Sequence, residues 1–161
     1  MQIPMSIKGL MMDPITNMPI VILHDPEGHR VLPIWVGVFE ANAIALQIEN
    51  VATPRPMTHD LLRNMLQELR AEVDKIVVTD LRENTFFALI HLHVGTDPVV
   101  IDARPSDAIA LALRTRAPIY VEDSVLEHAR SVETVPERGD DERLSKWLES
   151  LDPEDLGKYK M

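Results

Sequence analysis

Short runs of apolar, often β-branched residues recur along the chain, and this pattern predicts strands over much of its length. The clearest run is 85–94, in which Phe86, Ala88, Ile90, Leu92 and Val94 alternate with Phe87, Leu89, His91 and His93. Such alternation is typical of a strand that lays one apolar face on a core. On the same grounds we expect strands over residues 3–11, 18–24, 30–36, 75–81, 99–103 and 118–122.

Helices are expected over 38–50, 58–73, 105–114 and 124–132, from helical propensity or from apolar residues at helical spacing. Thr58 is a candidate cap for the second helix, whose apolar spacing continues to Val73. The third is the most distinctive. Pro105 and Ser106 suit its first turn, and residues 108–113 are small or branched and apolar, which predicts a helix buried on most sides.

The strands over 85–94 and 99–103 are connected by Gly95-Thr-Asp-Pro98, which has the composition of a turn. If Val94 pairs with Val99, counting back places His91 opposite Asp102 on one face of the sheet. A loop of odd length would break that pairing, because side chains alternate between the two faces.

The composition restricts the class of protein. The 161 residues suffice for one domain with a substantial core, which we expect over residues 1–132. The net charge of −10 lacks the basic excess that non-specific nucleic-acid binding normally requires. The chain has no cysteine, which excludes disulfides and suits a reducing compartment. Neither a membrane-spanning apolar run nor a signal-peptide pattern is visible, so we expect a soluble cytoplasmic protein.

Residues 133–161 differ in character from the rest of the chain, with nine acidic and five basic side chains. Apolar residues at helical spacing occur there only within 141–151, at Leu144, Trp147, Leu148 and Leu151. We interpret the segment as an acidic linker followed by one short amphipathic helix, which docks on its own domain or on a neighbouring copy.

The candidate chemistry centres on the junction between the strand over 99–103 and the helix that follows it. This junction holds two carboxylates, Asp102 and Asp107, and one guanidinium, that of Arg104. Glu40 lies at a similar junction, in the first turn of the first predicted helix. Carboxylates of this kind can act in acid-base chemistry or hold Mg²⁺. Arginine, with its fork of donors, can bind a phosphate.

Each of these residues also has a purely structural interpretation. Asp102 can accept backbone N–H groups of the turn, Asp107 can complement the helix dipole, and Arg104 can pair with either carboxylate. His91 and His93 have the spacing of a chelating pair on a strand, and equally that of a half-exposed strand end.

Other polar and aromatic residues have simple structural explanations too. His59 and Asp60 lie at the start of a predicted helix, where capping explains them as well as a functional role does. Trp35 and Trp147 are expected to be core and docking anchors, because the chain has too few aromatic residues for a base-stacking surface.

Three separated motifs resemble those of the bifunctional nuclease domain family. They are Leu32-Pro-Ile-Trp-Val-Gly37 with Glu40-Ala41, Arg55-Pro-Met-Thr-His-Asp60, and Asp102-Ala-Arg-Pro-Ser-Asp-Ala-Ile-Ala-Leu-Ala112. The resemblance extends over roughly residues 5–132. It implies an α+β fold, with helices packed on a mixed, largely antiparallel sheet of about seven strands. It also implies cleavage of RNA and DNA and a tendency to form homo-oligomers.

Two hypotheses follow. The first is a nuclease that hydrolyses phosphodiester bonds, assisted by Mg²⁺ or Mn²⁺ and without an organic cofactor. Glu40, Asp102 and Asp107 are its candidate catalytic residues. Arg104, Arg55 and His91 are its candidate substrate ligands, and the metal ligands are left unassigned. The alternative is a non-catalytic oligomeric interaction or regulatory module, in which the turn at residues 102–107 is a structural latch.

Overall fold

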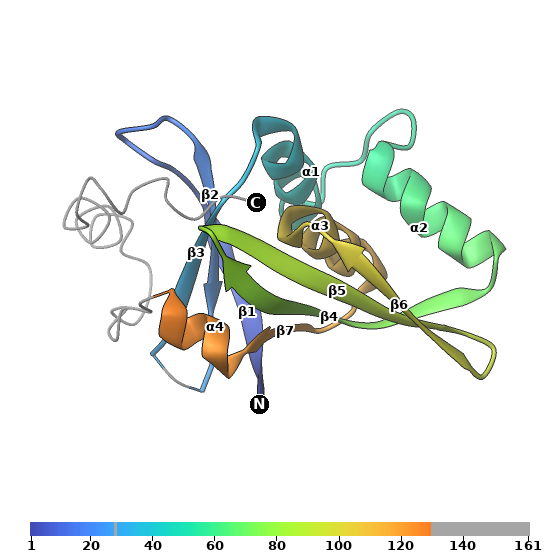
Figure 1. The fold of residues 1–161 in the computed structure, drawn as a ribbon. Helices are drawn as coiled ribbons and strands as arrows, with labels where there is room; N and C mark the ends of the chain where they lie inside the picture. The colour runs from blue at the N-terminus through green and yellow to red at the C-terminus, as the bar shows by residue number, and fades with distance from the viewer. Residues whose placement is uncertain (28, 130–161) are drawn as a thin grey trace.

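The computed structural model describes residues 1–27 and 29–129 of the chain (Figure 1). The strands of this part are β1 (Gln2–Met12), β2 (Pro19–His24), β3 (Val31–Trp35), β4 (Ala71–Arg82), β5 (Thr85–Val94), β6 (Asp97–Ala103) and β7 (Ile119–Glu122). The helices are α1 (Val38–Ile48), α2 (Thr58–Glu68), α3 (Pro105–Thr115) and α4 (Asp123–His128). The predicted linker and short helix of residues 133–161 lie outside the described residues.

The strands form one sheet in the order β3-β2-β1-β7-β4-β5-β6. Neighbouring strands run antiparallel except β4 and β7, which run parallel. The chain passes from the edge strand β6 through α3 to β7 in the middle of the sheet, and a parallel pair needs such a crossover. The expected single-domain α+β fold with a mixed, largely antiparallel sheet is confirmed.

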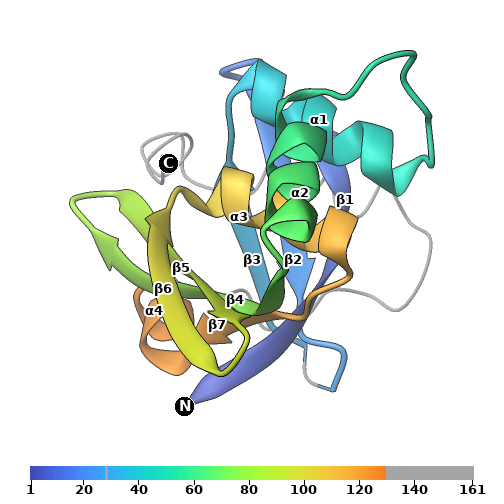
Figure 2. The same ribbon diagram turned by 90° about the vertical axis from the view of Figure 1, so that its right-hand side faces the viewer.

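Helices α1, α2 and α3 cover one face of the sheet, and α4 lies on the other side (Figure 2). The core between the three helices and the sheet includes Ile44 of α1, Ile76 of β4 and Ile109 of α3, none of which is exposed. Trp35, predicted to be a core residue, is buried at 1% exposure. The amino-terminal ends of the three helices are thereby held at fixed places above the sheet. No helix in the described part of the chain is long and apolar enough to cross a membrane.

The prediction for the second helix is wrong in its capping residue and at its carboxyl end. The capping residue of α2 is Met57, and Thr58 is the first helical residue. The helix ends at Glu68, and Arg70 has a positive φ of 58°, which ends helical geometry. Val73 therefore lies in β4, opposite Leu92. Its distance from the preceding apolar residues matches a helical repeat by coincidence.

The predicted pairing of His91 with Asp102 is also wrong. Gly95 has a φ of 62°, which permits a two-residue turn, so β6 begins at Asp97, opposite Val94. The shorter loop shifts the register by two residues. His91 consequently lies opposite Val100, and Asp102 lies opposite Leu89.

Candidate functional site

The first turns of three helices meet on the helix-covered face of the sheet. Glu40 lies in the first turn of α1, His59 in that of α2 and Asp107 in that of α3, while Arg104 is the residue immediately before α3. Helix amino termini carry partial positive charge and therefore favour carboxylates at such positions. We call these four residues the Arg104 cluster.

Arg104 joins the two carboxylates of the cluster. Its Nε donates to Asp107 Oδ2 at 2.9 Å, and its Nη2 donates to Glu40 Oε1 at 3.0 Å. The hydrogen bond that Arg104 donates to Asp107, together with the charges of Asp107 and Glu40, outweighs burial and raises the pKa of Arg104 above its usual value. The guanidinium therefore stays charged, and with 54% of its side chain exposed it remains accessible to a ligand.

Asp107 is held from two sides. Its Oδ1 lies 2.9 Å from His59 Nε2, and its Oδ2 accepts the bonds from Arg104. The His59 side chain is only 9% exposed, whereas 30% of the Asp107 side chain is exposed. A carboxylate that bonds one ring nitrogen fixes the orientation and the tautomer of an imidazole. The pair has the arrangement of an oriented general base.

Glu40 is positioned by the backbone before α1. Its carboxylate folds back over Gly37, and Oε2 lies so close to that residue that an added Cβ would collide with it. Gly37 has φ −68° and ψ 157°, an extended conformation open to any residue. Glycine is therefore needed here for space, to let Glu40 reach Arg104.

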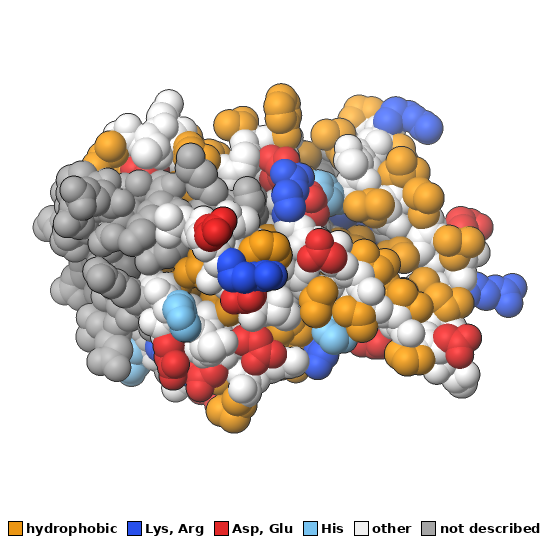
Figure 3. Space-filling model, viewed as in Figure 1, with side chains coloured by type: hydrophobic (Ala, Val, Ile, Leu, Met, Phe, Trp, Pro, Cys, Tyr) orange, Lys and Arg blue, Asp and Glu red, His pale blue; other side chains and the backbone are white. Residues whose placement is uncertain are grey.

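The Arg104 cluster borders a cavity of about 740 Å³ between α2, α3, β5 and β6. Most of its remaining lining is apolar and includes Phe39, Leu62, Met65, Leu66, Ile90 and Ile101. Figure 3 shows hydrophobic side chains over α2 next to a group of acidic and basic ones. A mostly apolar cavity with a few convergent polar groups is the usual form of a ligand site.

A second ion pair ties α2 to α3 behind the cluster. Arg114 Nε donates to Asp60 Oδ1 at 2.7 Å, and the remaining guanidinium nitrogens donate to the carbonyls of Ala110 and Ala43 at 2.9 and 3.0 Å. Asp60 Oδ2 also accepts the Met57 backbone N–H, which confirms its capping role. Burial alone would raise the pKa of Asp60, but the hydrogen bonds from Met57 and Arg114 outweigh it and lower the pKa.

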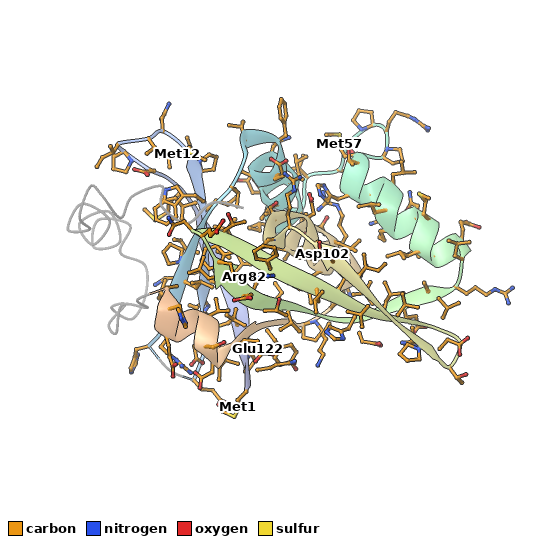
Figure 4. All side chains as sticks on the ribbon, in the orientation of Figure 1. Met1, Met12, Met57, Arg82, Asp102 and Glu122 are labelled. Carbon is orange, nitrogen blue, oxygen red and sulfur yellow. The ribbon has the colours of Figure 1, made fainter. Side chains whose placement is uncertain are left out.

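Of the residues singled out in the sequence, the structure brings together Glu40, Arg104 and Asp107. Asp102 borders the cavity near the end of β6, where Figure 4 labels it. It pairs with Leu89 and so lies on the opposite face of the strand from Ile101, which lines the cavity.

The two other candidate substrate ligands lie elsewhere. Arg55 is exposed in the loop between α1 and α2 and lines a separate hollow together with Asp60, Arg63 and Arg114. His91 is paired with Val100 and Lys75, on the face of β5 opposite the buried Ile90 and Leu92. Neither residue belongs to the Arg104 cluster.

His59 and Arg114 were not expected at this site. His59 lies within the motif Arg55-Pro-Met-Thr-His-Asp60. The resemblance of this motif and of the two other motifs to one family is the sequence signal that could have linked His59 to Glu40 and Asp107. Among the described residues, no group of three or more histidine, aspartate and glutamate side chains has the arrangement of a metal site.

Comparison with known proteins assigns the class of protein that this fold and site represent. The model of the bifunctional nuclease domain matches residues 21–134. The chain belongs to the bifunctional nuclease domain family, as its motifs indicated.

Individual relatives fall into two groups. An uncharacterized protein of Mycobacterium tuberculosis is 36% identical over 161 residues, covering 93% of this chain and 95% of that protein. Bifunctional nuclease 2 of rice is 31% identical over 121 residues, covering 71% of this chain and 37% of the plant protein. Bifunctional nuclease 2 of Arabidopsis thaliana is 34% identical over 93 residues, covering 56% of this chain and 28% of the plant protein. This chain thus corresponds to about a third of the plant proteins.

Proposed function

We propose that this chain is a nuclease that hydrolyses phosphodiester bonds of RNA and DNA at the Arg104 cluster. One observation carries the proposal. Three family motifs, far apart in the sequence, supply four ionisable side chains that meet at the edge of an open cavity. The names of the plant relatives support a nuclease activity, and the exposed guanidinium suits a phosphate substrate.

We assign phosphate binding to Arg104. Its Nε and Nη2 are directed at the two carboxylates, so among contacts within the described residues Nη1 is the donor left for a phosphate oxygen. Neutralising that oxygen stabilises the negative charge that develops in the transition state. The adjacent apolar cavity would hold the nucleoside next to the scissile bond.

We assign proton transfer to His59, with Asp107 as the residue that orients it. An imidazole held by a carboxylate can take a proton from an attacking water and thereby act as a general base. Glu40 is the second carboxylate of the site, and it accepts a hydrogen bond from Arg104, the residue to which we assign the phosphate. No step is assigned to Asp102, because its strand position places it on the other face of β6.

A divalent cation, Mg²⁺ or Mn²⁺, is part of the proposal. Glu40 and Asp107 converge on one guanidinium, so two carboxylates lie within reach of a shared ligand. Mg²⁺ is commonly held by one or two carboxylates together with substrate phosphate and water, and Glu40 and Asp107 would be those carboxylates. The ion would supply charge neutralisation at the phosphate and lower the pKa of a bound water.

The proposal is tested with the purified chain and fluorophore-labelled RNA and DNA of 20 to 30 nucleotides. Cleavage is measured at low salt, because the net charge of −10 repels polyanions. We expect cleavage with Mg²⁺ or Mn²⁺, loss of it with EDTA, and loss of it in Glu40→Gln and Asp107→Asn. Asp74→Asn is the matched control, since Asp74 bonds His93 at 2.7 Å outside the cluster. Cleavage by all three variants at the rate of the unchanged chain contradicts the assignment.

A non-catalytic interaction module is the second candidate. It is favoured by the observation that both oxygens of Asp107 are engaged by protein groups, as in a latch between α2 and α3. For a latch, Asp107→Asn lowers the melting temperature strongly and the unchanged chain shows no turnover. For the nuclease, the same variant keeps its melting temperature within a few degrees and loses turnover.

A further inference from the structure

Strand β6 is an exposed edge of the sheet. Within the described residues it pairs with β5 alone, and Asp97 to Asp102 are all exposed (Figure 2). The edge strand at the other end, β3, is buried along its whole length. Exposed edge strands are usually protected by charges, bulges or covering elements, because they offer free backbone groups to another strand.

The centre of this edge is instead apolar. Val99, Val100 and Ile101 are 37, 53 and 44% exposed. The apolar surface continues onto α2, where Leu62, Met65 and Leu69 line the same cavity as Ile101 and are 41, 52 and 68% exposed. A continuous apolar surface of this kind, next to free backbone groups, is typical of an interface.

The backbone of β6 points in alternating directions. The turn at Gly95 and Thr96 contains two residues, so Val94 and Asp97 form the hydrogen-bonded pair that closes the hairpin. Every second residue after Asp97 also bonds to β5. The backbone groups of Pro98, Val100 and Asp102 therefore face outward, and Val100 presents both an N–H and a C=O.

The sequence of β6 is complementary to itself. When two copies run antiparallel and are centred on Val100, that residue pairs with its own counterpart and Val99 pairs with Ile101 of the second copy. Asp102 then faces Pro98, which lacks an N–H but can accept the Asp102 N–H. Shifting the centre by half a residue would set outward-facing residues opposite residues whose backbone groups already bond β5, so that register forms no ladder.

We infer that β6 pairs antiparallel with β6 of a second copy of this chain, centred on Val100, so that two sheets join into one. This pairing brings the α2 helices of both copies together over the joined edge and covers the apolar surface between them. It also brings the turn at Gly95 and Thr96 of the second copy alongside Arg104, so each copy borders the cavity of the other.

Cysteine cross-linking tests the register, since the chain contains no cysteine. In Val100→Cys the two Cα atoms are about 5.5 Å apart in an antiparallel hydrogen-bonded pair, within the range for a disulfide. We expect a covalent dimer after mild oxidation. Asp97→Cys is the matched control, because its counterpart is six residues away along the strand, about 20 Å. It should stay monomeric on a non-reducing gel.

Light scattering on the purified full-length chain tests the association itself. We expect twice the chain mass of 18.2 kDa for the unchanged chain. Val100→Lys places two like charges at the centre of the pair and should give the mass of one chain with an unchanged circular dichroism spectrum. Ile15→Lys replaces another exposed β-branched residue, 60% exposed in the β1–β2 turn, and should remain dimeric.

Three results would overturn the inference: a monomeric unchanged chain, a dimeric Val100→Lys, or oxidation that cross-links Asp97→Cys as readily as Val100→Cys. These measurements use no nucleic acid. Their outcome is therefore independent of whether the chain proves to be a nuclease.

Discussion

His59 Nε2 lies 2.9 Å from Asp107 Oδ1 and joins the first turn of α2 to the first turn of α3. A second histidine and carboxylate, His93 and Asp74, are 2.7 Å apart on β5 and β4. The two pairs are chemically alike, but only the first borders the cavity. The pair of His93 and Asp74 therefore serves as the control when the role of the oriented His59 imidazole is tested.

His59→Gln should lower the cleavage rate by about 10²–10⁴-fold, the usual contribution of a general base. His93→Gln should leave the rate unchanged. The rates are compared under single-turnover conditions, with melting temperatures to confirm folding. Equal rates in the two variants would remove His59 from the mechanism.

Gly37→Ala should lower the cleavage rate by about 10²-fold, because the new methyl group displaces the Glu40 carboxylate from Arg104. The fold should persist, since the backbone at Gly37 is extended and the clash involves the end of a flexible side chain. Gly9→Ala serves as the control, as an added Cβ there meets nothing within 4 Å. Retained activity in Gly37→Ala would show that Glu40 is dispensable.

Arg114→Met should destabilise the fold by about 3–5 kcal/mol, because it leaves Asp60 without its buried partner. The Arg114 side chain is only 2% exposed and also bonds two backbone carbonyls. Arg114→Lys should be destabilising too, since a single ammonium cannot reproduce the fork of donors. Urea unfolding followed by tryptophan fluorescence measures both. A loss below 1 kcal/mol for Arg114→Met would contradict this assignment.

Asp13 should make stability depend on pH in the acid range. Burial alone would raise the pKa of Asp13, but hydrogen bonds from Thr16, Trp35 and Ile15 outweigh it and hold the pKa below the ordinary value of 3.8. A lowered pKa in the folded state means that the carboxylate stabilises the protein above pH 3.8 and that this contribution is lost as the pH falls through the folded value.

Asp13→Asn should accordingly be less stable than the unchanged chain at pH 7, by about 1.5–3 kcal/mol for lost charge-assisted hydrogen bonds. The difference should shrink as the pH falls below 3.8. Urea unfolding at a series of pH values gives the comparison. A difference that is constant from pH 7 to pH 3 would show that the charge of Asp13 contributes nothing.

The sequence predicted the elements of the fold better than their ends and pairings. The alternation within 85–94 identified β5 correctly because one face of that strand is buried. The pairing of His91 with Asp102 failed, since the register depends on the two residues of the turn at Gly95 rather than on apolar pattern. The sequence placed Val73 in a helix because its spacing of four residues from Leu69 fits both the helical repeat and the two-residue repeat of a strand.

The sequence predicted those residues of the site that a local pattern identifies, and missed those that only tertiary packing brings together. Glu40, Arg104 and Asp107 are visible as charges at strand-to-helix junctions, which local pattern identifies. His59 approaches Asp107 only through the packing of α2 on α3, 48 residues apart in the sequence, and no local pattern records such a contact. The contact between Arg114 and Asp60 likewise depends on the packing of α2 on α3.

Strand β7 is only four residues long, yet it is the single neighbour that β1 and β4 share. During synthesis, the strands on either side of it can form two separate small sheets, but they cannot become one until Ile119–Glu122 has emerged from the ribosome. Until then both β1 and β4 expose an open flank, at which an unfinished chain can aggregate. Completion of the fold is thus timed by one of its shortest segments.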